Sequence, residues 1–273
     1  MTILSRLFEH TQRYVRAVFA DRLRQAGFVS YKGEDIHWYR LVNGEVVQAV
    51  YFITRHKTLG TWMDIRYGCH PIWIPCVFQK SPYFAGNPDD TQMCYLLPEE
   101  IPGSTSNGYD GTTRLIGKSN APYAEDALIM CPLDLNFGMD VLDRLLLLLD
   151  ETTTPRACYE LHKRVQGPVV ERGSTGLMSS CFVDEVLFWE DQALYPICQK
   201  YTDQGEFAFN NYKNGCIPGA GKNFTQEWEK CAMLSQLFRE GRFQDYLSTF
   251  PERAQKNLKL LSKHTGIQTN GSN

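Results

Sequence analysis

The sequence predicts an α+β fold, in which an N-terminal helix packs on an antiparallel β-meander and a mainly helical C-terminal half follows. Three observations favour this fold. Apolar residues at helical spacing end at Gly27, alternating strands flank Asn43-Gly44, and helical spacing returns after Asp134. The expected parts are an α+β sheet domain, a helical region packed on it and a flexible tail, over residues 1–133, 134–264 and 265–273.

The first helix is predicted to run from Thr2, which suits an N-cap, to Ala26. Gly27 can adopt the left-handed conformation that commonly ends a helix. The apolar stripe that predicts this helix comprises Ile3, Leu4, Leu7, Phe8, Val15, Val18, Phe19 and Leu23. A stripe of this kind is typical of a helix that buries one face against another element.

The dipeptide Asn43-Gly44 predicts a β-hairpin between residues 35–42 and 45–54, because a two-residue type I′ turn favours this pair. A turn of that length would place Tyr39 opposite Gln48, close enough for a hydrogen bond. The second strand is apolar on both faces. We therefore expect it to be central and covered on both sides, with the first helix as one cover.

A third strand is predicted over residues 61–67, where Met63, Ile65 and Tyr67 share one face. Residues 71–120 are rich in turn-forming residues and poor in periodicity. Short strands around residues 73–78 and 93–97 could extend the sheet from within this segment.

Helical spacing marks the C-terminal half of the chain. Helices are predicted over residues 135–149, 155–165, 182–201, 224–240 and 251–264. Residues 237–247 predict a simple αα-hairpin, since no second copy at a fixed period indicates a repeat protein.

Composition indicates a soluble cytoplasmic protein. The formal net charge of −3 gives no broad attraction to nucleic acid or anionic lipid, and no apolar block is long enough to cross a bilayer. The nine cysteines include no Cys-x-x-Cys pair, which favours reduced and mostly buried thiols. We therefore expect no nucleic-acid partner, no membrane partner and no cofactor, and the sequence does not indicate an oligomeric state.

Two segments approach the P-loop motif without matching it. Residues 111–119 place five residues between the glycines where the motif needs four. Residues 215–222 fail in the same way, and Asn223 replaces the hydroxyl residue that should reach magnesium. Neither segment follows an apolar strand, so neither predicts nucleotide binding.

Clusters of metal-ligating and acidic residues have structural explanations. Four residues could supply zinc ligands, namely Cys69, His70, Cys76 and Cys94. Their spacing is wider than in structural zinc sites, so no metal site is predicted. Cys158 and His162 share a face of a predicted helix, where a core cysteine beside a boundary histidine is the expected arrangement. The acidic pairs at residues 184–185 and 190–191 predict a solvated helix face rather than paired catalytic carboxylates.

The first ~70 residues resemble a bacterial family in their order of elements. A long helix is followed by Lys32, an aromatic strand over residues 37–40 and a further strand over residues 48–52. The residues that carry the resemblance are Gly27, Phe28, Tyr39, Gln48 and Phe52. In these features the chain is similar to bacterial domain-of-unknown-function family 4304. The resemblance implies no established activity, and it does not cover the chain from Asp134 onward.

The most site-like group of residues lies on the predicted meander. It comprises His37, Tyr39, Gln48, His56, Trp62, Asp64 and Arg66. If that surface were open, it could form a groove for a ligand or a peptide. In the structural interpretation, which we favour, the aromatic rings fill the core and Asp64 pairs with Arg66 or Arg40.

The absence of catalytic motifs and the presence of an aromatic sheet with a helical appendage favour a non-catalytic protein-binding module. An immunity-like protein or an adaptor, with a possible protein partner, fits this description by analogy. The competing hypothesis is a small-molecule-binding enzyme with a site on the meander face or within residues 71–120. A deep pocket would favour the enzyme, and a shallow exposed apolar patch would favour the binding module.

Overall fold

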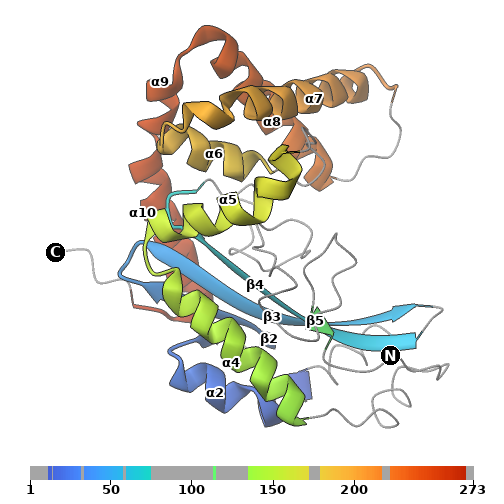
Figure 1. The fold of residues 1–273 in the computed structure, drawn as a ribbon, viewed down its shortest axis with the longest axis vertical. Coiled ribbons are helices and arrows are strands. Elements are labelled where there is room, and N and C mark those ends of the chain that lie inside the picture. Colours follow the sequence, from blue (N-terminus) through green and yellow to red (C-terminus); the bar gives the residue numbers. More distant parts are fainter. Residues whose placement is uncertain are drawn as a thin grey trace. The chain divides into compact units, whose positions relative to one another are not determined.

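A computed structural model describes residues 12–13, 15–31, 34–57, 60–74, 113–114, 135–171, 179–216 and 222–268 (Figure 1). The chain forms two compact units. The sheet unit comprises residues 1–71, 93–161 and 260–273, and the helical unit comprises residues 72–92 and 162–259. The domain limits predicted from the sequence stay a prediction.

The architecture is α+β, as predicted, with an antiparallel sheet in the N-terminal part and mostly helices in the C-terminal half. The elements in chain order are α2 (Ala20–Gln25), β1 (Val29–Tyr31), β2 (Glu34–Val42), β3 (Val46–Lys57), β4 (Gly60–Pro71), β5 (Thr113–Arg114), α4 (Leu135–Glu151), α5 (Pro155–Glu171), α6 (Ser180–Phe188), η2 (Gln192–Leu194), α7 (Tyr195–Lys213), α8 (Lys222–Glu240), α9 (Phe243–Leu247) and α10 (Phe250–Thr265).

The predicted first helix is interrupted within the described residues. Residues 15–18 are helical, Phe19 lies in a turn, and α2 follows. The backbone N–H of Phe19 still donates to the Val15 carbonyl at 2.9 Å, and that of Leu23 donates to the Phe19 carbonyl at 3.0 Å. Gly27 has a φ of +82°, which confirms the predicted left-handed end of the helix. Residues 1–11, where the helix was predicted to begin, lie outside the described part.

The sheet has the strand order β1-β2-β3-β4-β5, and every neighbouring pair is antiparallel. At the hairpin between β2 and β3, Asn43 and Gly44 have positive φ, as a type I′ turn requires. The Glu45 N–H donates to the Val42 carbonyl at 3.0 Å, which closes the turn. Val42 pairs with Val46, so Glu45 is an additional residue outside the ladder.

This additional residue makes the predicted register wrong by one position. Tyr39 lies opposite Ala49, and Gln48 lies opposite Arg40. Residues opposite each other in a ladder share a face, whereas successive residues alternate between faces. Tyr39 and Gln48 are therefore on opposite faces of the sheet, and the hydrogen bond expected between them is absent because of this alternation.

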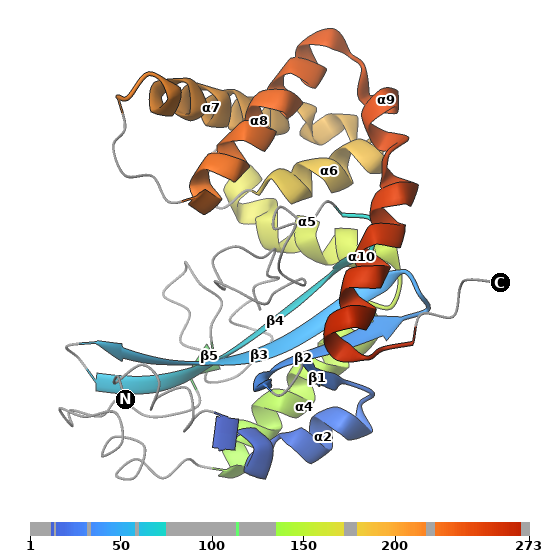
Figure 2. The same cartoon turned by 180° about the vertical axis from the view of Figure 1, so that it is seen from behind.

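Strand β3 is buried on both faces, as predicted for the central strand. Val50 and Phe52 lie on one face and Val47 and Ala49 on the other, and all four are at most 1% exposed. On the first face, the ring of Phe19 stacks on that of Phe52 with centroids 5.0 Å apart. Figures 1 and 2 show α2 and α4 on this side of the sheet, which confirms that the N-terminal helical segment is one of the covers.

Strand β4 extends to Pro71, beyond the predicted 61–67, and its outer neighbour is β5. Thr113 pairs with Ile65, and Arg114 pairs with Asp64. The strand predicted around residues 73–78 is wrong in its described part, because residues 72–74 form a turn and a bend. The strand predicted around residues 93–97 lies outside the described residues.

The helix predicted over residues 182–201 is wrong, since the structure divides it into α6, η2 and α7. The break coincides with Glu190, whose φ of +52° a right-handed helix does not allow. Pro196 lies in the first turn of α7, where its missing N–H removes no helical hydrogen bond. A second break follows α8, where Gly241 has a φ of +67° before α9, near the turn predicted in this segment.

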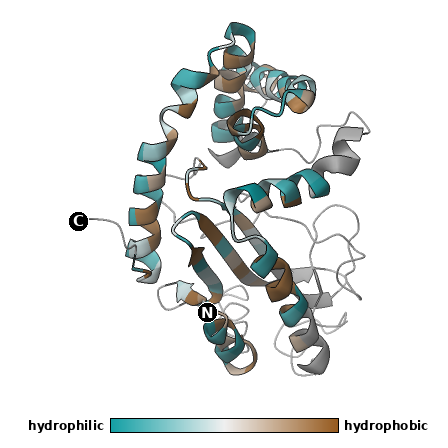
Figure 3. Cartoon of the chain, turned by 60° about the vertical axis from the view of Figure 1, so that its left-hand side comes forward, coloured by the Kyte–Doolittle hydropathy of each residue, from teal (hydrophilic) through white to brown (hydrophobic). Residues whose placement is uncertain are grey.

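Two contacts organise the helical unit. Helices α7 and α8 approach closely at Gly205, where a Cβ atom would lie 2.3 Å from the Cβ of Cys231. Asn257 of α10 donates its side-chain amide to the carbonyls of Ile72 and Ile74, at 2.8 and 3.0 Å. Figure 3 shows alternating hydrophobic and hydrophilic bands along α10, as expected of a helix with one face against its neighbours.

Candidate functional site

The predicted meander residues do not share one face of the sheet. The register places one group together, namely His37, Tyr39, Trp62, Asp64 and Arg66. Gln48 and His56 occupy positions on the opposite face. For residues 56, 62, 64 and 66 the structure describes the backbone alone. A single surface formed by all seven residues is therefore excluded by the register, and any ligand contact of either group stays a prediction.

Gln48 has a structural explanation, because it is fully buried and caps the end of α4. Its amide nitrogen donates to the carbonyl of Leu149 at 2.5 Å and to that of Thr152 at 3.0 Å. The last carbonyls of a helix have no partner within the helix, and a buried carbonyl must find one elsewhere. Gln48 thus joins the centre of the sheet to the C-terminal end of α4.

Arg40 completes this connection on the same face. Its guanidinium donates to the Gln48 side-chain oxygen at 2.8 Å, to the Ala26 carbonyl at 2.8 Å and to the Asp150 carboxylate at 2.7 Å. The guanidinium also lies over the ring of Phe28, 4.7 Å from its centroid. The predicted pairing of Arg40 with Asp64 is not the one observed here. The fork geometry of arginine allows it to join both helix ends to the sheet at once.

On the other face, the C-terminal end of α10 lies against β1. Tyr31 stacks on His264 with ring centroids 5.5 Å apart, and its hydroxyl is 3.2 Å from Nδ1 of that histidine. His37 contacts the edge of the Tyr31 ring at 6.4 Å. Tyr39 is fully buried. The end of α10 therefore lies against β1 beside His37, and a ligand-binding role for His37 and Tyr39 stays a prediction.

The predicted metal ligands are only partly described. Cys69 and His70 are consecutive residues of β4 and so point to opposite faces, while Cys76 and Cys94 lie outside the described residues. No group of three or more His, Cys, Asp or Glu residues suited to a metal ion occurs within the described ranges. The thiol of Cys158 contacts the Thr152 carbonyl at 3.7 Å.

The two segments that approach the P-loop motif are also partly described. Thr113 and Arg114 form strand β5 rather than the continuous loop that the motif requires. Gly215 lies in the turn after α7 with a φ of +73°, and Lys222 is the first residue of α8. The described parts of both segments therefore differ from a phosphate-binding loop.

A second group of polar residues lies inside the helical unit and was missed from the sequence. Asp184 and Glu185 are both 0% exposed, so the predicted solvated face is wrong for this pair. Asp184 accepts hydrogen bonds from Lys230 Nζ at 2.5 Å and from the Tyr246 hydroxyl at 2.7 Å. Glu185 contacts Nδ1 of His162 at 2.5 Å. Both carboxylates find polar partners on distant segments of the chain, as buried charges must.

Burial and charge shift the pKa values of this cluster. Burial raises the pKa of Asp184 above its ordinary value despite the attraction of Lys230 and the hydrogen bond from Tyr246. Burial opposes the charge of Lys230, but Asp184 outweighs it and the pKa of the ammonium group lies well above its ordinary value. Burial, followed by the negative charge of Asp184, raises the pKa of the Tyr246 hydroxyl. The attraction between Asp184 and Lys230 thus opposes the cost of burying each charge.

A thiol adjoins the same ion pair. Lys230 Nζ lies 3.6 Å from the Sγ atom of Cys181, which is 7% exposed. Cys181 lies in the first turn of α6, whose N-cap Ser179 accepts a hydrogen bond from the Phe182 N–H. The Lys230 ammonium group thus contacts both the Cys181 thiol and the Asp184 carboxylate.

Glu227 holds the start of α6 through a further set of bonds. Its carboxylate accepts from the Ser180 N–H and hydroxyl, each at 2.8 Å, and from the Tyr201 hydroxyl at 2.7 Å. Burial, with the charge of Glu227, raises the pKa of Tyr201. A carboxylate at a helix N-terminus is favourably placed with respect to the helix dipole. This group therefore fixes the position of Cys181, the next residue of α6.

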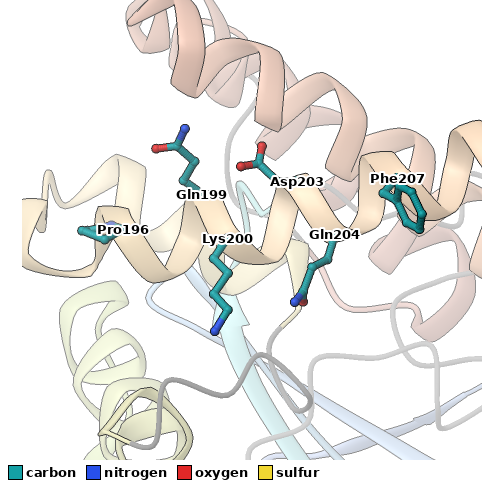
Figure 4. Close-up of a pocket in the computed structure, with 6 residues that line it drawn as sticks. All are labelled: Pro196, Gln199, Lys200, Asp203, Gln204 and Phe207. Carbon is teal, nitrogen blue, oxygen red and sulfur yellow. The ribbon is translucent and has the colours of Figure 1, made fainter.

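An open groove follows the outer side of α7 (Figure 4). It has a volume of about 530 Å³ and is lined by Pro196, Gln199, Lys200, Asp203, Gln204 and Phe207. In Figure 4, Lys200 and Gln204 point to one side of the helix and Gln199 and Asp203 to the other. Phe207 is 69% exposed, which is unusual for an aromatic side chain of this size. This surface was not predicted from the sequence, because the segment after residue 201 was not predicted to be helical.

Comparisons with known proteins do not identify the chain: no family model, no curated protein and no solved structure matches it. The resemblance to family 4304 accordingly stays a prediction. None of the helices that the structure describes is long and apolar enough to cross a bilayer.

Proposed function

We propose that this chain is a non-catalytic protein-binding module, of immunity-like or adaptor type, and that the outer side of α7 contacts its partner. The observation that carries this proposal is the exposure of Phe207, at 69%, beside the groove. Aromatic residues are enriched among the side chains that contribute most to protein interfaces, and they act from positions surrounded by polar groups. The side chains around Phe207 provide such surroundings.

The groove also indicates the chemistry of the partner. A volume of about 530 Å³ accommodates a few side chains of a peptide segment. Lys200 and Asp203 supply one charge of each sign, and Gln199 supplies an amide. We infer that the partner presents an apolar anchor for Phe207 and flanking acidic and basic groups, as a short amphipathic segment of a protein does.

The enzyme hypothesis has less support. Two of the residues on which it depends, Tyr39 and Gln48, are fully buried, and Gln48 uses its amide to bond α4. Most of residues 71–120 lie outside the described part of the chain. The protein-binding proposal is therefore the one that the described contacts favour.

Site-specific photo-crosslinking in cells tests the proposal. A benzophenone amino acid replaces Phe207 in one variant and Leu147 in the control, since Leu147 of α4 is 65% exposed and lies outside the groove. We expect an adduct with a different protein at position 207 but not at position 147. With that protein purified, Phe207→Ser should weaken binding at least about 10-fold, and Leu147→Ser should leave it unchanged.

Three outcomes would contradict the proposal. The first is that adducts at position 207 form only with further copies of this chain. The second is that the same proteins are captured from both positions, and the third is that the purified partner binds the Phe207→Ser variant with unchanged affinity. The first outcome would indicate self-association, and the other two would indicate non-specific capture.

A further inference from the structure

We propose that a second copy of this chain occupies the groove on α7 when the protein partner is absent. The two copies of α7 lie antiparallel across a two-fold axis that passes between residues 201 and 202. The partner then gains access to Phe207 by displacing the second copy. This inference concerns the regulation of the same surface, and its displacement step rests on the proposed function.

The groove is self-complementary about the middle of α7. Pro196 and Phe207 lie equally far along the chain from the midpoint between residues 201 and 202. Lys200 and Asp203 are also equally far from that midpoint. In a two-fold interface each contact occurs twice, and an antiparallel helix pair brings together residues that are equally far from the axis. Lys200 therefore faces Asp203 of the second copy, and Phe207 faces its Pro196.

The same four positions have the spacing of a helix–helix contact. They are separated by intervals of four, three and four residues, namely Pro196, Lys200, Asp203 and Phe207. This is the spacing of a coiled-coil seam, and it keeps the four side chains within about 60° of the helix circumference. All four residues are exposed. Gly205, where α7 meets Cys231 of α8, lies on the opposite side of α7, so the seam does not compete with α8.

Asp203 is held in place for a contact of this kind. Its Oδ1 atom accepts a hydrogen bond from the Ser235 hydroxyl and lies 3.7 Å from Arg239 Nη1, yet the side chain stays 47% exposed. Its second carboxylate oxygen can therefore face Lys200 of the second copy while these contacts remain. In Figure 4, Lys200 and Asp203 point to opposite sides of α7. Across the two-fold axis the paired side chains thus extend beside each other rather than end to end.

The expected dimer is weak and reversible. One helix against its copy is a smaller interface than the roughly 1,600 Å² of a standard protein complex. The apolar layers cover Phe207, which is 69% exposed in the single chain, with the ring of Pro196. The ion pairs determine direction and register more than affinity. A weak dimer of this kind is suited to a resting state that a partner displaces.

Analytical ultracentrifugation of the purified full chain tests the inference without the partner. We expect a monomer–dimer equilibrium over a series of protein concentrations. Lys200→Glu and Asp203→Lys should each weaken the dimer at least about 10-fold, because like charges then face each other in both pairs. An equimolar mixture of the two variants should dimerise again, because each contact then joins opposite charges. Lys256→Glu, at an exposed position of α10, is the control for net charge and should leave the dimer unchanged.

A benzophenone amino acid at position 207 reports the direction of the two helices. The purified variant is mixed with isotope-labelled unsubstituted chain, irradiated and digested, so that mass spectrometry identifies links between different copies. We expect attachment within the peptide that contains residue 196 of the second copy. Attachment within the peptide that contains residue 207 would indicate a parallel pair and would overturn the inference.

The inference is also wrong if the chain sediments as a monomer at every concentration, or if folded Lys200→Glu protein dimerises as strongly as the unsubstituted chain. Circular dichroism establishes that each variant folds. If both charge variants fold, a mixture that stays monomeric contradicts the register. If Asp203→Lys does not fold, the attachment site of the benzophenone decides the register.

Failure of this inference and failure of the proposed function are distinguishable. A monomeric chain that captures a different protein at position 207 would refute the dimer alone. A dimer that captures no other protein would refute the proposed partner alone. Once that partner is purified, its addition should dissociate the dimer, and a complex that retains both copies of the chain would refute displacement.

Discussion

Replacement of Gln48 by leucine distinguishes a structural role for this residue from a ligand-binding one. The change places an apolar side chain of similar size in a fully buried position and removes every polar contact of the amide. The Leu149 carbonyl keeps the Thr152 hydroxyl as a donor at 2.9 Å, so it is not left without a partner. The Arg40 Nε–H loses its acceptor and the Thr152 carbonyl loses its nearest donor.

The expected destabilisation follows from these losses. A neutral hydrogen bond contributes about 1 kcal/mol net, and a bond to a charged group contributes about 1.5–3 kcal/mol. Additional apolar burial by leucine offsets about 1 kcal/mol of this total. We expect Gln48→Leu to lower the free energy of unfolding by about 2 kcal/mol.

Urea unfolding followed by circular dichroism measures this change, with hydrogen exchange of the β2 and β3 peptides as a local readout. Gln199→Leu is the matched control, because it is the same change of residue type at a position that lines the groove on the outer side of α7. Its effect should stay within about 0.5 kcal/mol. If the two variants unfold at the same urea concentration, Gln48 does not hold α4 to the sheet, and a ligand-binding role regains support.

Two further predictions concern the helical unit. Gly205→Ala should destabilise it by about 1–3 kcal/mol in urea unfolding, because the new Cβ would lie 2.3 Å from that of Cys231, a clash larger than the helix-propensity gain of about 1 kcal/mol. Cys231→Gly in the same chain should restore stability, exposed Asn210→Ala should show no loss, and a more stable Gly205→Ala protein would contradict the close approach. Burial raises the pKa of Cys198 and Cys231 from 9.0 to about 12, so the folded state binds their protons more tightly. The resulting stabilisation is complete below pH 9 and is lost as pH rises toward 12, with about 1.4 kcal/mol lost per thiol at pH 10. Urea midpoints at pH 8 and 10 should differ less in a Cys198→Ala variant, and equal shifts in both proteins would disprove this origin.

The sequence predicted the sheet better than its register. Asn43 and Gly44 do adopt the positive φ angles that their dipeptide favours. The same two residues do not determine whether Glu45 joins the ladder, because that depends on how β2 and β3 pack over their whole length. One additional residue was sufficient to separate Tyr39 from Gln48 and to divide the predicted site between two faces.

The helical half shows what local patterns leave out. Pro196 within the predicted helix 182–201 was a readable sign of a new helix start, since proline is tolerated in the first turn and disfavoured in the interior. The burial of Asp184 had no such sign. Its partners Lys230 and Tyr246 are distant in sequence, so helical spacing alone gives the same pattern for a solvated acid and a paired one.

The bonds from Asn257 to Ile72 and Ile74 have a consequence for dissection of the protein. They attach residues that directly follow β4 to a helix near the other end of the chain, and the remaining segments alternate between the sheet unit and the helical unit in the same way. A cut at any one peptide bond would leave fragments that each carry an incomplete share of some unit. Neither unit is therefore encoded by one uninterrupted stretch of coding sequence, and gene fusions or transplants should retain the whole chain.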